Sequence, residues 1–281
     1  MEKRQMKRLI VIVAGILLAL WGCAGKEQGA QLGNPGVRVT FFDVGKGDAI
    51  LIETKGQNML IDTGYDDTDQ VILQYLARQK IKKLDYLAIT HFDKDHVGGA
   101  DKILAAVEVG KVLQPGYESD SRQYREYCEA LEEKGMCPQI VADPLAFTLG
   151  DAQLLAYPPC QEEYQEQDND FSLVISMKYK DRSFLFTGDC ERERLEELLA
   201  QTDFGLAHDV LKVPHHGRKE KNSEEFLGAV APRAAVITCS EEKMADEEVL
   251  LALENLGADI YFTYQGSVAI LCDGDTISVV Q

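Results

Sequence analysis

The stretch that decides the fold of this chain is His91-Phe92-Asp93-Lys94-Asp95-His96. It places two imidazoles and two carboxylates within six residues, directly after the apolar run Leu84–Thr90, which predicts a buried strand. Ligands at the end of a rigid strand are held in fixed directions, as a metal site requires. Imidazole suits zinc, iron or manganese, and added carboxylates favour harder ions such as manganese. We therefore expect a metal-binding loop; the alternative is a solvated polar loop.

The first 22 of the 281 residues differ from the rest. A basic start is followed by the apolar run Leu9–Leu20, which is too short to span a bilayer comfortably and is typical of a signal peptide. Leu20-Trp21-Gly22-Cys23 resembles the lipobox of bacterial lipoproteins. The resemblance implies cleavage before Cys23, a lipid on its sulfur, and a domain anchored to the membrane outside the cytoplasm. A plain secretory signal or an uncleaved anchor is the alternative.

The remainder has the composition of an ordinary globular domain, with 45% hydrophobic and 27% charged residues in the whole chain. Residues 23–36 predict a flexible linker, and residues 37–281 a single large domain. Removing residues 1–22 removes four basic side chains and one acid, so the net charge changes from −18 to −21. This acidic balance argues against a broad nucleic-acid-binding surface, because phosphates would be repelled.

The cysteines and one histidine carry little functional signal. Cys128 and Cys137 lie nine residues apart and have a spacing that allows a disulfide, but the sequence fixes no pairing. Cys239 and Cys272 lie in apolar runs and are expected in the core. We expect His208 at the surface.

Apolar periodicity predicts strands and helices that alternate in two mixed halves. The expected strands are Val37–Val44, Ala49–Glu53, Asn58–Asp62, the run to Thr90, Val109–Leu113, Ala152–Tyr157, Leu173–Tyr179, Ser183–Thr187, Asp209–Val213, Ala234–Thr238, Asp259–Phe262, Ser267–Leu271 and Thr276–Val280. Helices are expected near Asp69–Gln79, Ile103-Leu104, Ser121–Lys134, Glu191–Ala200 and Glu247–Leu256. This order indicates two sheets packed face to face with helices outside.

Five strings end strands in polar or glycine-containing turns: Phe41–Asp48 (FFDVGKGD), Leu60–Gly64 (LIDTG), His91–Gly99 (HFDKDHVGG), Leu185–Asp189 (LFTGD) and Leu211–Gly217 (LKVPHHG). As an ordered set they resemble the metallo-β-lactamase superfamily, and within it the hydrolase domain of ComEC-type competence proteins. The resemblance covers residues 37–281. It implies an α/β fold, the four-layer αββα sandwich, with two divalent metal ions, manganese or zinc, at the strand ends.

The resemblance also implies roles for individual residues. His91 and Asp93 would bind a first metal ion, Asp95 and His96 a second, and Asp189 would bridge both. His215 would complete the second site, as the first histidine after the strand and proline. His216 would be a catalytic acid, the ligand in place of His215, or a group that supports a ligand. Asp62 would orient the metal loop by hydrogen bonding, or simply cap a turn.

The chain departs from the family pattern in three places. It has no third histidine between His96 and Asp189, so Asn169 or Asp170 would line the site instead and favour manganese. Arg218 stands where the competence branch usually has serine. The loop after Ala234–Cys239 lacks the histidine-proline pair common in that branch.

These features predict an enzyme, a metal-dependent hydrolase that uses a metal-activated hydroxide, most simply a phosphodiesterase or DNA nuclease. Its substrate would be nucleic acid or a small phosphoester. One alternative is the hydrolysis of a small ester, lactone or envelope phosphoester. An acidic surface suits a small substrate of this kind better than it suits a polymer. The other is a surface lipoprotein that binds without catalysis. The sequence indicates no protein partner.

Overall fold

The computed structural model describes residues 36–281 except 166 and 202–204. The expected signal peptide, Cys23 and nearly all of the linker lie outside the described residues. The described residues form one compact unit. Among the described helices, none combines the length and apolar character needed to cross a membrane.

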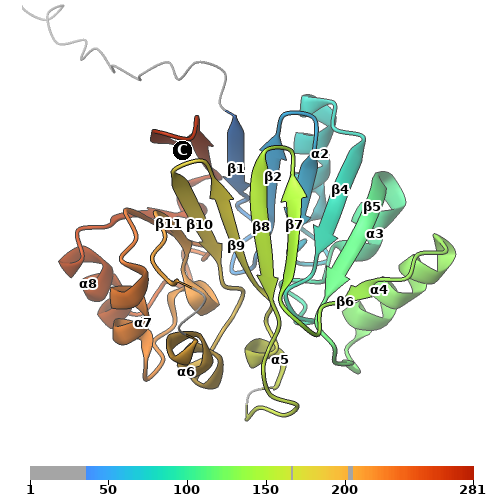
Figure 1. Cartoon of the computed structure of the whole chain (residues 1–281). Coiled ribbons are helices and arrows are strands. Elements are labelled where there is room, and N and C mark those ends of the chain that lie inside the picture. The colour runs from blue at the N-terminus through green and yellow to red at the C-terminus, as the bar shows by residue number, and fades with distance from the viewer. Residues whose placement is uncertain (1–35, 166, 202–204) are drawn as a thin grey trace, which may run out of the picture. The chain divides into compact units, whose positions relative to one another are not determined.

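Two mixed sheets form the centre of the unit (Figure 1). The first contains, in spatial order, β15 (Ile277–Val280), β14 (Val268–Cys272), β1 (Val37–Phe41), β2 (Ile50–Thr54), β3 (Asn58–Ile61), β4 (Lys83–Ala88), β5 (Glu108–Gln114) and β6 (Gln139–Ile140). The second contains β13 (Asp259–Phe262), β12 (Ala234–Ile237), β11 (Val210–Lys212), β10 (Arg182–Phe186), β9 (Val174–Tyr179), β8 (Ala152–Tyr157) and β7 (Leu145–Leu149). In each sheet an antiparallel part adjoins a parallel part, which begins at β3 and at β10 respectively.

The helices cover the outer faces of the sheets (Figure 1). On one side lie α2 (Asp69–Gln79), α3 (Ala100–Ala106) and α4 (Arg122–Glu133), and on the other α6 (Arg192–Ala200), α7 (Ser223–Val230) and α8 (Glu247–Asn255). The short helix α5 (Gln167–Asp170) precedes β9, and the 3₁₀ turns are η2 (Pro214–Gly217) and η3 (Thr263–Gln265).

Three apolar cores hold these layers together. The central core lies between the sheets, where Phe41 of β1 meets Phe186 of β10 with ring centroids 6.2 Å apart. A second core lies under α2, α3 and α4, around Leu87. A third lies under α6, α7 and α8, around Leu211. Strands β2 and β3 carry alternate residues in the central and second cores, so they are apolar on both faces over Ile50–Ile52 and Met59–Ile61. The αββα prediction is confirmed.

The structure also tests two minor expectations, on His208 and on the cysteines. The prediction that His208 lies at the surface is wrong: it is 7% exposed, and its Nε2 and Nδ1 lie 2.7 Å from Ser176 Oγ and 2.9 Å from the Leu206 carbonyl oxygen. These two contacts give both ring nitrogens a polar partner, so the imidazole can be buried. Cys239 and Cys272 are buried as expected, and the six described cysteines, Cys128 and Cys137 among them, carry free thiols.

Candidate metal centre

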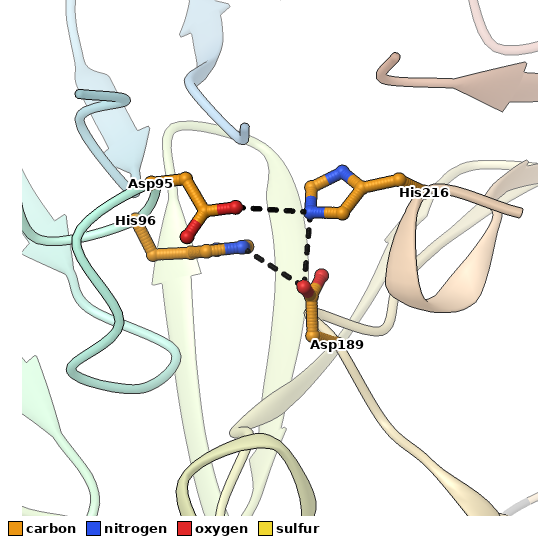
Figure 2. A group of neighbouring side chains, drawn as sticks. All are labelled: Asp95, His96, Asp189 and His216. Atoms are coloured by element: carbon orange, nitrogen blue, oxygen red, sulfur yellow. Dashed lines mark ion pairs between the residues drawn. The ribbon is translucent and has the colours of Figure 1, made fainter. Parts of the chain in front are cut away.

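Asp95, His96, Asp189 and His216 converge at one edge of the two sheets (Figure 2). Asp95 and His96 lie in the loop after β4, Asp189 follows β10, and His216 lies in the η2 turn after β11. All three strands belong to the parallel parts of the sheets. The carboxyl ends of parallel strands share an edge, and ligands commonly bind there in open α/β sheets.

These four residues, which we call the tetrad, are at most 6% exposed. Oδ2 of Asp189 lies 2.9 Å from Nε2 of His216 and 3.3 Å from Nε2 of His96. Oδ2 of Asp95 lies 3.7 Å from Nε2 of His216. Both Nε2 atoms are buried without a hydrogen bond. The two nitrogens face carboxylate oxygens without forming well-aligned hydrogen bonds, and a divalent cation at this point would accept both nitrogens and both carboxylates, so the residues fit a metal ion.

Each tetrad imidazole is oriented from its far side. Nδ1 of His96 lies 2.8 Å from Oδ2 of the buried Asp62, which also accepts hydrogen bonds from the amide and hydroxyl of Thr90, both at 2.7 Å. Nδ1 of His216 lies 2.7 Å from the carbonyl oxygen of Thr238. With Nδ1 donating in each ring, Nε2 is the atom presented to the tetrad.

The charge state of the metal-free tetrad follows from burial and the nearby acids. Burial disfavours the imidazolium of His96, but Asp189, Asp62 and Asp48 outweigh it and hold the pKa of His96 well above its usual value. Burial lowers the pKa of His216. A metal ion at the tetrad would therefore have to displace a proton from His96, because only neutral imidazole is a ligand.

A lysine and an aspartate that the sequence analysis missed support the tetrad. The ammonium of Lys212 is fully buried, 2.6 Å from Oδ2 of Asp48 and 3.3 Å from Oδ1 of Asp189, and it donates to the Gly188 carbonyl oxygen at 2.7 Å. Asp189 thus turns Oδ1 to Lys212 and Oδ2 to the tetrad. The signal was present in the sequence, since Lys212 interrupts the otherwise apolar β11 run.

His91 and Asp93 border the tetrad. His91 is fully buried, its ring centroid lies 4.0 Å from that of His96, and its Nε2 has no hydrogen bond and lies 3.9 Å from Oδ2 of Asp93. The Asp93 side chain is 42% exposed. Burial raises its pKa to about 6, although His96 opposes the shift. His91 and Asp93 thus place an imidazole nitrogen and a carboxylate beside the tetrad.

The two neighbouring histidines of η2 point in different directions. His215 and His216 both adopt the left-handed backbone conformation, with φ of 44° and 56°. His216 reaches the tetrad, whereas Nδ1 of His215 lies 2.9 Å from Oε1 of Glu191 and its Nε2 stays 3.9 Å from Asp189. The tetrad thus contains His216 and not His215, to which the sequence analysis gave the ligand role.

Asn169 and Asp170 lie on α5, on the side of Glu191. Nδ2 of Asn169 donates to Oε1 of Glu191 at 2.8 Å. Oδ1 of Asp170 accepts hydrogen bonds from the amides of Glu191 and Arg194, at 2.8 and 3.2 Å, and so caps the first turn of α6. Burial raises the pKa of Asp170 to about 6. Both residues thus position α6 and the Glu191–His215 pair, while Oδ1 of Asn169 is buried without a hydrogen-bond partner among the described residues.

The outer side of the tetrad carries two further residues that the sequence analysis missed. The ammonium of Lys46 donates to Oδ2 of Asp95 at 3.2 Å. The half-buried phenol of Tyr65 also interacts with Asp95, and burial together with that carboxylate raises the pKa of Tyr65. Tyr65 therefore stays a hydrogen-bond donor at the mouth of the site.

The fold and this site define a class of protein. Residues 42–240 match the family model described as the metallo-beta-lactamase superfamily, and the chain belongs to that superfamily. Two solved structures have a similar fold: the CmlA beta-hydroxylase E377D mutant (13% identity, TM-score 0.58, 85% of this chain and 55% of that one) and the metallo-beta-lactamase fold protein YhfI from Bacillus subtilis (10% identity, TM-score 0.55, 87% and 100%). These likenesses show the fold alone, and a hydroxylase among them means that the fold does not fix the reaction.

The curated relatives of this chain include competence proteins, as the resemblance predicted. The chain is 28% identical over 265 residues to ComE operon protein 3 of Bacillus subtilis (strain 168), covering 85% of this chain and 32% of that protein. It is 33% identical over 216 residues to Recombination protein 2 of Haemophilus influenzae (74% and 25%), and 28% identical over 199 residues to Competence protein ComA of Neisseria gonorrhoeae (70% and 26%). The chain spans about a third or less of each of these relatives.

Proposed function

We propose that this chain is a metal-dependent hydrolase of phosphodiesters. The observation that carries the proposal is the convergence of four buried ligand-type side chains with the Nε2 atoms of His96 and His216 left without a hydrogen bond. A divalent ion, when bound, polarises a phosphoryl oxygen and lowers the pKa of water toward neutrality. Asp95, His96, Asp189 and His216 would hold the first ion, and His91 with Asp93 would help to hold a second.

The other residues act on these ligands. Asp62 and the carbonyl group of Thr238 fix the two imidazole rings, and Lys212 offsets the negative charge of Asp189. His215, held by Glu191 with Nε2 toward Asp189, lies where it can contact a substrate or its leaving group. We accordingly give the ligand role to His216 and the substrate-side role to His215.

Nucleic acid and a small phosphoester remain the two candidate substrates. The names of the curated relatives, which include competence and recombination proteins, favour DNA. A specific observation favours a small substrate: Lys219 and Lys221, next to the histidine turn, lie 2.9 Å from Glu248 and 4.0 Å from Glu196. Exposed lysines offset by neighbouring glutamates give that surface little net positive charge, and the chain is acidic overall.

The test uses the purified chain loaded with manganese or zinc. Metal content by mass spectrometry is combined with hydrolysis of bis-p-nitrophenyl phosphate and of single- and double-stranded DNA. We expect bound metal and phosphodiester cleavage in the wild type, loss of both in Asp189→Ala, and retention of both in Asp143→Ala, an exposed aspartate. Bound metal with no cleavage of any phosphodiester would point to an ester or lactone. A chain that takes up no metal would favour a binding protein instead.

We further propose that residues 37–281 function outside the cytoplasm, anchored through a lipid on Cys23. The basic and apolar leader and the lipobox-like string support this proposal. Cell fractionation of the wild type and Cys23→Ala tests it. The wild type should sediment with membranes and the variant should lose the lipid; equal lipid labelling of both proteins would contradict the proposal.

A further inference from the structure

We propose that Lys46 forms an anion-binding subsite at the metal centre and recognises a negatively charged phosphoryl oxygen of the substrate. The inference rests on the proposed function and adds a residue that determines the charge of the preferred substrate. Its evidence lies in the turn Gly45-Lys46-Gly47-Asp48 between β1 and β2.

This turn is fixed against the metal loop by its backbone. The amide of Asp48 donates to the carbonyl oxygen of Asp95 at 3.1 Å, and the amide of Gly47 donates to the carbonyl oxygen of Gly45 at 3.1 Å. A Cβ atom at Gly47 would lie 2.6 Å from the Asp95 carbonyl oxygen, so only glycine allows this approach. The backbone of Lys46 is therefore held beside the tetrad, independently of the contacts that its ammonium makes.

The ammonium of Lys46 lies between the tetrad and solvent. It is 3.2 Å from Oδ2 of Asp95, the oxygen that faces Nε2 of His216, and the Lys46 side chain is 19% exposed. Asp95 is its one hydrogen-bond partner among the residues that the structure describes. An ammonium has three donors, so Lys46 keeps donors for a ligand.

The second lysine at the centre cannot take this role. The Lys212 side chain is 0% exposed, and its ammonium already contacts Asp48, Asp189 and the Gly188 carbonyl oxygen. Lys212 therefore offsets charge inside the protein, while Lys46 faces the side from which a substrate arrives.

The chemistry of the site makes such a cation useful. An anionic substrate approaching the tetrad meets the carboxylates of Asp93 and Asp95, which repel it. A metal ion held by Asp95 would offset the charge of that carboxylate, and the attraction between Asp95 and the ammonium of Lys46 would become weaker. The ammonium then remains within reach of Asp95 and close to the ion, where it would bind a phosphoryl oxygen as a point charge. A neutral ester would gain nothing from it.

The competing explanation is that Lys46 only positions Asp95 as a ligand. In that case Lys46→Gln would reduce metal affinity, and phosphate binding would fall only as a consequence. Measuring metal content and phosphate binding on the same samples separates the two explanations.

The experiment compares metal-loaded wild type with Lys46→Gln, using inorganic phosphate as the probe in titration calorimetry. Lys94→Gln is the matched control, because Lys94 is an exposed lysine of the metal loop. We expect Lys46→Gln to weaken phosphate binding about tenfold with metal content unchanged, and Lys94→Gln to change neither. In the same variant KM for bis-p-nitrophenyl phosphate should rise, while hydrolysis of p-nitrophenyl acetate should not change.

Two results would overturn the inference: phosphate affinity of Lys46→Gln within twofold of the wild type, or a loss of metal that accounts for the loss of phosphate. Phosphate binding needs no turnover, so it remains measurable if no phosphodiester is cleaved. Failure of the proposed hydrolase function is thus distinguishable from failure of the Lys46 subsite.

Discussion

Replacing Lys212 with methionine should be among the most destabilising single changes in this domain. The substitution keeps most of the side-chain volume and removes one charge. That charge lies 2.6 Å from Asp48 and 3.3 Å from Asp189, whose side chains are 1% and 2% exposed. Both carboxylates would lose this cation in a water-poor interior, where the imidazoles of His96 and His216 remain near them.

The size of the effect follows from the geometry. Removing one partner of a buried ion pair typically costs about 3–5 kcal/mol, because the remaining charge is buried without compensation. The lost hydrogen bond to the Gly188 carbonyl oxygen adds about 1 kcal/mol. We therefore expect the metal-free chain to lose at least about 3 kcal/mol of its free energy of unfolding. With metal bound the loss should be smaller, since the ion offsets the charge of Asp189.

Urea unfolding followed by far-ultraviolet circular dichroism measures this loss, with and without metal. Lys178→Met is the matched control, because Lys178 is an exposed lysine on strand β9 of the same sheet. Adding Asp48→Asn to Lys212→Met should restore part of the stability, since it removes one of the two uncompensated charges. A Lys212→Met chain within about 1 kcal/mol of the Lys178→Met chain would refute the argument, as it would mean that water or proton uptake relieves the buried acids.

Three further predictions concern the surroundings of the tetrad. Asp62→Asn removes the carboxylate that orients His96 and should weaken metal binding about 10- to 100-fold in a chelator competition; an affinity within threefold of the wild type would contradict it. Burial lowers the pKa of His208, so the stability that its neutral ring contributes is present above about pH 6.5 and is lost as the pH falls below that value. The difference in unfolding free energy between wild type and His208→Gln should therefore shrink by up to about 1.4 kcal/mol per pH unit below 6.5, and a flat difference between pH 7.5 and 5.5 would rule this out. Gly98→Ala places a Cβ atom 2.6 Å from the main-chain nitrogen of Asp66 and should lower the free energy of unfolding in urea by more than about 1 kcal/mol. Gly228→Ala is the control: Gly228 has open space around it in α7, so this change should be neutral or slightly stabilising.

Apolar periodicity located most of the fold because most elements pack into a core on a full face. Helix α2 and strands β8 and β13 have the bounds that the sequence predicted. The sequence analysis missed β7, an edge strand that pairs only with β8 and keeps one fully buried side chain, Leu149. It also missed α7, in which Gly228 interrupts an eight-residue helix. Short or half-buried elements show weak periodicity, and tertiary packing decides their structure.

The choice between His215 and His216 lay beyond sequence reasoning for a different reason. It depends on two consecutive residues in the left-handed conformation, which neither histidine favours by itself. The surrounding contacts enforce that backbone: Thr238 holds one ring and Glu191 faces the other. These partners follow β12 and β10, and no local pattern relates them to the histidine pair. Strained backbone of this kind is typical of functional sites.

The sequence indicates which residues can act as ligands, but tertiary packing decides whether they lie close together. Strings at strand ends identify Asp95, His96 and Asp189 from the sequence, because the end of an apolar run followed by polar residues is a local signal. The 3.3 Å between His96 and Asp189, however, joins a loop of the first sheet to a loop of the second. That distance is set by the central core, where β1 packs against β10 through Phe41 and Phe186. The metal centre is therefore a product of sheet packing, and a change in this core should move the ligands apart even where every motif residue is kept.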